Sequence, residues 1–387
     1  MGKRRVIVLF GGRSAEHDVS CTSAVSVLRS IDADRYDIVP IGITTDGRWV
    51  HAEGAAALLR APRALEELPN RVAAEGVDVL PTDVLRSGVL RSDVLRSDVL
   101  ESTDTAGELP VVIPLLHGPF GEDGTMQGML ETAGVPYVGA GVLGSAVAMD
   151  KGVAKDLLAR AGLPQAKWLT RAAWDLADVA AVVAFRSVVE RELGFPCFVK
   201  PANLGSSVGV SKAHNAEEFA ASVALAVSYD EWVVVEEAIQ GREIEFAVLG
   251  NEKPEVSIAG EIRPGHEFYD YDDKYVNDGA QLLIPAPLTP EQLAEGQLLA
   301  VAAFRALRCE GMARVDFFLD DGSTGGPGRG WLVNEANTIP GFTPISMYPK
   351  LWAASGVSYA ELLDRLISLA IARHERRSGR VGRGRGA

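Results

Sequence analysis

Apolar residues in the first third of the chain fall into short runs that alternate with helical patterns. Val6–Phe10 is a continuous apolar run, and Tyr36–Ile43 and Val111–Leu116 are largely apolar. Their lengths are those of buried strands. Val19 to Arg29 has apolar residues at helical spacing, and a second helical pattern around Met126 ends before a glycine. Strands that alternate with helices predict a parallel, doubly wound sheet.

After about residue 142 the pattern becomes a mixture of strands and helices. Phe195–Pro201 and Val208–Lys212 are expected as strands on either side of a small-residue segment, Asn203–Ser207, which we call the Gly/Ser loop. Two late strands are expected at Ala313–Leu319 and Trp331–Glu335. This mixture predicts α+β lobes in place of a second parallel sheet.

These patterns divide the chain into three parts and a tail. We expect an N-terminal α/β domain at 1–139, a central lobe at 140–236, a C-terminal lobe at 237–372 and a disordered basic tail at 373–387. An electrostatic tether is the alternative role for that tail. Residues 84–100 repeat a five-residue unit that fits neither helical nor strand periodicity, so we interpret them as a surface insertion without catalytic meaning.

Composition excludes several classes of protein. A formal net charge of −14 argues against nucleic-acid binding, which needs clustered Lys and Arg, but leaves room for a nucleotide in a local cationic pocket. The longest apolar stretch near the N-terminus, Val6–Phe10, is too short for a signal peptide or a membrane span. We therefore expect a cytoplasmic protein without a membrane partner. Cys21, Cys197 and Cys309 are too scattered for a disulfide framework or a zinc site.

Carboxylates interrupt the two late apolar strands. Asp316 lies in ARVDFF, and Glu335 and Asn337 lie in LVNEAN. Residues two apart on a strand point the same way, so Glu335 and Asn337 can share a target. Two carboxylates and an amide oxygen are a hard ligand set that suits Mg²⁺ bridging phosphates. An ordinary salt bridge between Arg314 and Asp316 is the alternative interpretation.

A candidate phosphate site lies in FVKPANLGSSVGVSK. Lys200 ends a strand, and the Gly/Ser loop offers backbone N–H groups that can approach phosphate oxygens. The spacing is not the Walker pattern, and a Gly-rich hairpin without function is the alternative. Lys151, Glu236 and Glu243 are weaker signals, because surface lysines and exposed glutamates are common.

Taken in order, these residues resemble the series of the ATP-grasp superfamily. Within it, GGRSAEHDVS, LHGPFGEDGTMQG, GSAVAMDK, GSSVGVSK, FYDYDDKY, ARVDFF and NEANTIPGFTPIS are similar to the motifs of the D-alanine–D-alanine ligases. The resemblance covers roughly Val6 to Ala372, apart from the repeat. It implies an ATP-grasp fold in which two α+β lobes clasp ATP beside an N-terminal substrate-binding domain.

The resemblance also implies a reaction for peptidoglycan precursor synthesis. In this family ATP phosphorylates one D-alanine, and the amine of a second attacks the acyl phosphate to give D-alanyl-D-alanine. By motif, phosphates would be held by Lys151, Lys200, Ser206 and Ser207, and adenine and ribose by Glu236 and Glu243. Two Mg²⁺ ions, for which Mn²⁺ can substitute, would bind Asp316, Glu335 and Asn337. Arg314 and the backbone of Gly341 would stabilise the tetrahedral oxyanion.

Substrate contacts follow from the same resemblance. Glu16 would pair with the ammonium of the first D-alanine, with His117 close by, and Ser346 and Lys274 would bind the carboxylate of the second. Tyr275 would bond Ser206, which bonds Glu16, and so close the Gly/Ser loop over the substrates.

Other functions stay open at this point. A D-alanine–D-lactate ligase is disfavoured by Lys274 and Tyr275, and another ATP-grasp carboxylase or peptide ligase by Glu16 and His117. A nucleotide-binding sensor or scaffold without catalysis is a different class, but Arg314 and the metal ligands are all present. Glu237 stands where relatives often carry a basic residue, so the adenine pocket departs from the family pattern at this position. Family resemblance alone suggests a homodimer.

Overall fold

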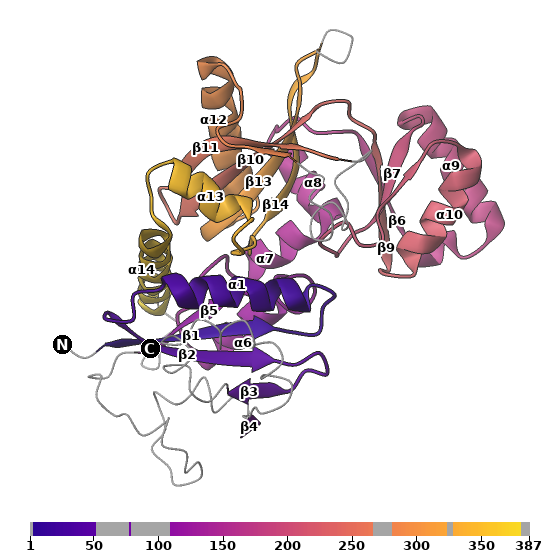
Figure 1. The fold of residues 1–387 in the computed structure, drawn as a ribbon. Coiled ribbons are helices and arrows are strands. Elements are labelled where there is room, and N and C mark those ends of the chain that lie inside the picture. The colour runs from indigo at the N-terminus through magenta and orange to yellow at the C-terminus, as the bar shows by residue number, and fades with distance from the viewer. Residues whose placement is uncertain (1–2, 52–76, 79–108, 266–280, 323–327, 381–387) are drawn as a thin grey trace.

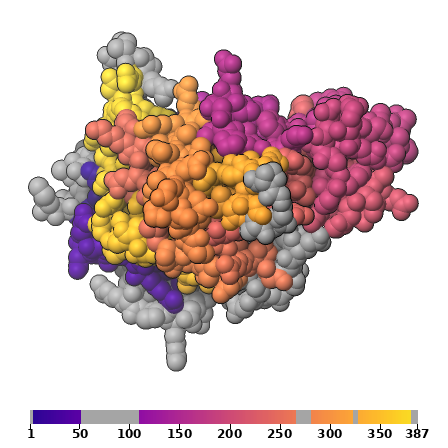
Figure 2. Space-filling view, turned by 90° about the horizontal axis from the view of Figure 1, so that it is seen from above, coloured from indigo at the N-terminus to yellow at the C-terminus, as the bar shows by residue number. Residues whose placement is uncertain are grey.

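Three sheets organise the computed structural model, which describes residues 3–51, 77–78, 109–265, 281–322 and 328–380 (Figure 1). The repeat at 84–100 lies outside these described residues, as do Lys274 and Tyr275. Figure 2 shows the second sheet and its helices as a lobe that projects from the rest of the molecule.

The first sheet has the order β4-β3-β2-β1-β5. β1 (Arg4–Gly11) pairs in parallel with both β2 (Tyr36–Ile43) and β5 (Val111–Pro114), as the apolar runs predicted. β3 (Trp49–His51) pairs with β2 as an antiparallel hairpin, and β4 (Val77–Asp78) extends the edge.

Helices cover both faces of this sheet. Val6, Val8 and Phe10 pack with α1 (His17–Ser30), and Ile7 and Leu9 pack with α6 (Thr125–Ala133) on the opposite face. α6 ends where Gly134 takes φ 71°, the left-handed conformation that glycine adopts most easily. Because alternate residues of β1 face two different cores, the strand is a continuous apolar run.

The second sheet is antiparallel, with the order β6-β9-β7-β8. Its strands are β6 (Trp168–Ala172), β7 (Cys197–Pro201), β8 (Ser211–Ala213) and β9 (Trp232–Glu237). Helices α9 (Val179–Glu192) and α10 (Ala216–Val227) pack on one face through buried residues such as Phe185 and Phe219. The 3₁₀ helix η1 (Ala173–Leu176) follows β6. The opposite face is left for the functional site.

The third sheet is also antiparallel, with the order β12-β11-β10-β13-β14. Its strands are β10 (Arg242–Gly250), β11 (Glu255–Arg263), β12 (Gln281–Leu283), β13 (Gly311–Asp320) and β14 (Gly330–Asn337). α12 (Pro290–Ala306) begins with a capping box, in which Thr289 and Gln292 bond each other's backbone N–H groups. α13 (Met347–Ala354) packs against β10 and β11 on the other side.

Two helices link the first sheet to the others. α7 (Val142–Met149) contacts β14, and α8 (Lys151–Arg160) runs directly on from it. The cap between them is Asp150, whose side chain accepts a hydrogen bond from Val153 N at 2.9 Å. This cap fixes the start of α8, and therefore the position of Lys151.

The last helix corrects one prediction. α14 (Tyr359–Ser378) continues through the basic segment that was expected to be disordered from Arg373 onward. Arg373 is 3% exposed and donates hydrogen bonds to the carbonyl oxygens of Tyr137 and Gly139. Arg377 pairs with Glu310 at 2.9 Å. These partners stabilise the helix as far as Ser378, and residues 381–387 lie outside the described chain. None of the helices in the described ranges is long and apolar enough to span a membrane.

Candidate functional site

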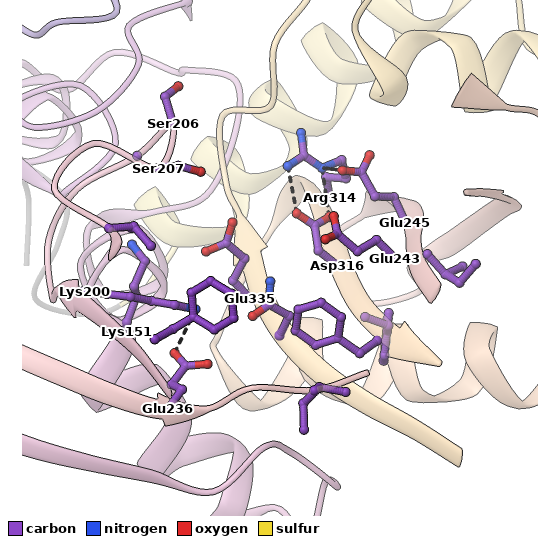
Figure 3. Close-up of a pocket in the computed structure, with 18 of the residues that line it drawn as sticks. Lys151, Lys200, Ser206, Ser207, Glu236, Glu243, Glu245, Arg314, Asp316 and Glu335 are labelled. Atoms are coloured by element: carbon purple, nitrogen blue, oxygen red, sulfur yellow. Dashed lines mark hydrogen bonds and ion pairs between the residues drawn. The ribbon is translucent and has the colours of Figure 1, made fainter. Parts of the chain in front are cut away.

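A cavity lies between the second and third sheets, with about 990 Å³ of space including its open mouth. Its walls come from β7, β9, β10, β13, β14, the start of α8 and the Gly/Ser loop (Figure 3). The sequence-predicted residues that line it are Lys151, Lys200, Ser206, Ser207, Glu236, Glu243, Arg314, Asp316 and Glu335.

Lysines and one glutamate form the wall nearest α8. Lys200 Nζ lies 3.1 Å from Glu236 Oε1, and Lys155 Nζ lies 3.2 Å from Glu236 Oε2. Burial opposes ionisation of Glu236, but the two ammonium groups outweigh it and lower the pKa of this carboxyl to about 2. Sequence reasoning missed Lys155, although it follows Lys151 by one helical turn and therefore shares its face.

Arg314 and its carboxylates form the opposite wall. Arg314 donates from Nε and Nη2 to the two oxygens of Asp316, at 2.8 and 2.7 Å, and its Nε lies 3.1 Å from Glu245 Oε1. Burial would lower the pKa of Arg314, but the carboxylates Asp316 and Glu245 outweigh it and hold the pKa well above its usual value. Glu245 was not predicted. Its signal is its position two residues after Glu243 on one side of β10, where Ile244 and Phe246 face the core.

The predicted metal ligands lie on neighbouring strands. Asp316 and Glu335 are direct cross-strand partners, and the register shift beside them leaves Asn334 as the extra residue of β14. Asn334 lines the cavity, whereas Asn337 accepts a hydrogen bond from Ile339 N at 3.0 Å. No group of three or more His, Cys, Asp or Glu in the described ranges forms a metal cluster, so the fit to a divalent cation depends on two carboxylates with an amide oxygen.

The Gly/Ser loop closes the cavity toward the first sheet. Ser206 and Ser207 have φ of 49° and 59°, a left-handed conformation that is uncommon for residues with a side chain. Ser206 Oγ donates to Glu16 Oε1, and Lys151 Nζ donates to the carbonyl of Leu204. Two consecutive residues in this conformation are typical of a functional loop held by its surroundings.

Glu16 lies at the N-terminus of α1 and is 8% exposed. A Cβ on Gly118 or on Gly205 would lie 2.7 or 2.9 Å from Glu16 Oε2, so the carboxylate fits only because both neighbours are glycines. Glu122, which sequence reasoning also missed, accepts a hydrogen bond from Gly118 N at 2.7 Å. Burial, followed by the charge of Glu16, raises the pKa of Glu122 to about 8.

His117 is buried beside these groups. Its Nδ1 lies 3.0 Å from the carbonyl oxygen of Ile339, which can only accept, so Nδ1 carries a proton. Its Nε2 lies 3.4 Å from Ser23 Oγ. Burial lowers the pKa of His117, which favours the neutral ring.

Ser346 and Gly341 lie together before α13. Ser346 is the N-terminal flanking residue of that helix, and its Oγ accepts a hydrogen bond from Thr343 N at 3.0 Å. A Cβ on Gly341 would lie 2.6 Å from Ser346 Oγ, so the backbone of Gly341 is close to this hydroxyl. A helix N-terminus with a hydroxyl suits a carboxylate.

Comparisons with known proteins cover almost the whole chain. The family model described as D-ala D-ala ligase N-terminus matches residues 5–140, and that described as D-ala D-ala ligase C-terminus matches residues 157–368. The D-alanine–D-alanine ligase of Shouchella clausii is 49% identical over 380 residues, with 97% of each chain covered. That of Geobacillus thermodenitrificans is 45% identical over 375 residues, covering 96% of this chain and 97% of the relative.

Solved structures agree with these matches. The D-alanine–D-alanine ligase of Coxiella burnetii superposes with a TM-score of 0.78 at 35% identity, covering 97% of this chain and 96% of that one. The D-Ala:D-Ser ligase VanG of Enterococcus faecalis gives a TM-score of 0.77 at 34% identity, and the match covers 95% of this chain and 100% of that one.

Proposed function

This chain belongs to the D-alanine–D-alanine ligase family, and we propose that it joins two D-alanines, with ATP converted to ADP and phosphate, to supply D-alanyl-D-alanine for peptidoglycan. The observation that carries this function is the hydrogen bond from Ser206 to Glu16. Through this bond the carboxylate of Glu16, a group able to bind an ammonium, lies next to Ser206, which lines the cavity.

The reaction has two steps. An oxygen of the first D-alanine carboxylate forms a bond to the γ-phosphorus of ATP, and the bond to ADP breaks. The neutral amine of the second D-alanine then attacks the acyl carbon, and inorganic phosphate leaves as the amine loses its proton. Lys151 and Lys200 supply positive charge to the phosphates, with Ser206 and Ser207 above them. Arg314 is proposed to stabilise charge on the tetrahedral oxyanion, with the backbone of Gly341 as second donor.

Asp316, Glu335 and Asn337 are proposed to hold two Mg²⁺ ions, with Mn²⁺ as substitute. When bound, these ions neutralise charge on the phosphates. The donor chemistry fits, because Asp316 and Glu335 face each other across two strands in the cavity wall. Glu243 is proposed to accept hydrogen bonds from the ribose hydroxyls, and Glu236 to lie at the adenine end.

Substrate contacts are proposed at the end of the cavity nearest α1. Glu16 takes the ammonium of the first D-alanine, with neutral His117 behind it. Ser346, at the start of α13, takes the carboxylate of the second together with Lys274. Tyr275 is proposed to complete the chain of hydrogen bonds through Ser206.

The proposal extends to the location and oligomeric state of the enzyme. We propose a cytoplasmic homodimer, for which sedimentation that shows only monomer at working concentration is the contrary result. The N-terminal domain at 1–139 and the lobes at 140–236 and 237–372 are retained as its working division.

ADP and dipeptide formation from ATP, Mg²⁺ and D-alanine tests the function. Stoichiometric ADP and D-alanyl-D-alanine are expected, with little product from D-lactate or D-serine added as competitors. Predominant depsipeptide or D-alanyl-D-serine keeps the fold and overturns the choice of second substrate. No ADP release with any of the three overturns the proposed function.

A further inference from the structure

Lys155 is a buried lysine for which the proposed reaction has no use. Its side chain is 2% exposed, on the turn of α8 that follows Lys151. Burial lowers the pKa of Lys155, and Glu236 opposes that effect. A buried ammonium is costly unless a carboxylate lies against it. Its position beside the phosphate-binding wall therefore calls for an explanation.

Glu236 connects this lysine to the cavity. Each oxygen of its carboxylate has a different partner: Oε2 lies 3.2 Å from Lys155 Nζ, and Oε1 lies 3.1 Å from Lys200 Nζ. Lys200 lines the cavity, whereas Lys155 is not among the described lining residues. Figure 3 shows Glu236 below Lys200, on the side away from Ser206 and Ser207. The described contact between Lys155 and the cavity therefore runs through Glu236 and Lys200.

We propose that Lys155 is a positioning residue that keeps the charge of Lys200 available to the phosphates of ATP, an inference that rests on the proposed function. Lys200 and Glu236 alone form a neutral pair, and a carboxylate with both oxygens free can hold an ammonium from either side. Lys155 occupies one oxygen and adds a positive charge, so the three groups together present a net charge of +1 to the cavity. In a buried site this difference acts strongly on an anionic ligand.

The placement on α8 supports this role. Lys151 and Lys155 are one turn apart and share a face, so one helix carries a lysine that lines the cavity and a lysine behind its wall. The backbone of Lys155 is also fixed, because its carbonyl oxygen accepts a hydrogen bond from Gln165 Nε2 at 3.0 Å. The ammonium therefore reaches Glu236 from a rigid element.

Steady-state kinetics of Lys155→Met, which keeps the length of the side chain but not its charge, tests the proposal. The matched control is Lys253→Met, which makes the same substitution at an exposed lysine that does not line the cavity. The KM for ATP is expected to rise by about 10-fold or more in Lys155→Met, because a buried charge pair is lost from the phosphate site. The KM for D-alanine is expected to change by less than about twofold in both variants, since Lys155 does not act on the amino acid.

A double mutant separates positioning from general destabilisation. If Lys155 acts mainly through Glu236, Lys155→Met raises the KM for ATP much less in the Glu236→Gln background than in the wild-type protein. An unchanged KM for ATP in Lys155→Met overturns the proposal, and so do parallel increases in both KM values with a lowered unfolding midpoint. Lys155→Gln, which can still donate to Glu236, provides the same comparison if the methionine variant does not fold. ATP affinity measured by calorimetry gives the same comparison without turnover. It therefore tests Lys155 even if the wild-type protein releases no ADP, a result that would overturn the proposed function and not this inference.

Discussion

Ser206 donates a hydrogen bond to Glu16, which precedes it by 190 residues, and this contact joins the Gly/Ser loop to the N-terminal domain. The loop lines the cavity proposed for the nucleotide, and Glu16 lies at the start of α1 beside the first sheet. One hydroxyl therefore links the two proposed substrate sites across the interior of the molecule.

Ser206→Ala is expected to uncouple the loop from Glu16. A hydrogen bond to a charged group contributes about 1.5–3 kcal/mol, so kcat/KM for D-alanine is expected to fall by about 10- to 100-fold. The same loss is expected to lower the unfolding midpoint by only a few degrees, because a large protein unfolds with a large entropy change. Ser187→Ala, on the exposed side of α9, is the control. Wild-type kcat/KM in Ser206→Ala contradicts the role of the contact.

Gly205→Ala tests the same closure by adding one methyl group. The new Cβ would lie 2.9 Å from Glu16 Oε2, so either the loop or the carboxylate must move. Dipeptide formation is expected to fall by about 10-fold or more, because a displacement of this size in a site is costly. Gly128→Ala in α6, where nothing lies within 4 Å, is the matched control and should retain full activity. Equal activity of the two variants is the contrary outcome.

Arg314→Lys keeps the charge and removes the planar fork. An ammonium cannot reproduce two parallel bonds to Asp316 while it also reaches Glu245. We expect kcat to fall by about 100-fold, the usual effect of losing one oxyanion donor. Single-turnover product formation measures this, and Arg365→Lys, at a partly exposed ion pair with Glu361, is the control. A kcat within a few-fold of wild type excludes Arg314 from the chemical step.

The parts of the fold that were predictable depend on local sequence. The apolar run of β1 and the Thr289-Pro290 start of α12 are determined by residues close in the chain, and the strand predicted from that run was confirmed. Parallel pairing of β1 with β2 followed from alternating elements. The burial of Arg373 did not, because its carbonyl partners on Tyr137 and Gly139 come from a distant segment, and the prediction of disorder there was wrong.

The residues of the site likewise divide into those that local sequence indicates and those that only the folded structure identifies. Lys200, Asp316 and Glu335 stand out because each interrupts an apolar strand or ends it. Glu245 and Lys155 do not, because their importance comes from the strand register and helix packing that bring them to Arg314 and Glu236. A buried charge is recognised from its partner, and the partner is known only once the chain is folded.

Glu122 gives the stability of the protein a specific pH dependence. The pKa of its buried carboxyl is raised from 4.5 to about 8, chiefly by burial and then by Glu16, while Lys151 opposes and Glu335 adds to that shift. Since the folded pKa is above the unfolded one, the folded state binds this proton more tightly. The stabilisation is full below about pH 4.5 and is lost as the pH rises to about 8. Glu236 affects stability in a different pH range. Because its pKa is lowered in the folded state, its stabilising contribution is lost only as the pH falls from 4.5 toward about 2.

Glu122→Gln removes the titration and keeps an acceptor for Gly118 N. The difference in unfolding midpoint between Glu122→Gln and wild type is therefore expected to grow in favour of the variant between pH 5 and about pH 8. Unfolding followed by circular dichroism across that range measures it. Glu131→Gln is the control, since Glu131 is a partly exposed carboxyl paired with Arg377. A midpoint difference that stays constant with pH shows that Glu122 does not take up a proton on folding, and that its carboxylate lies charged beside Glu16.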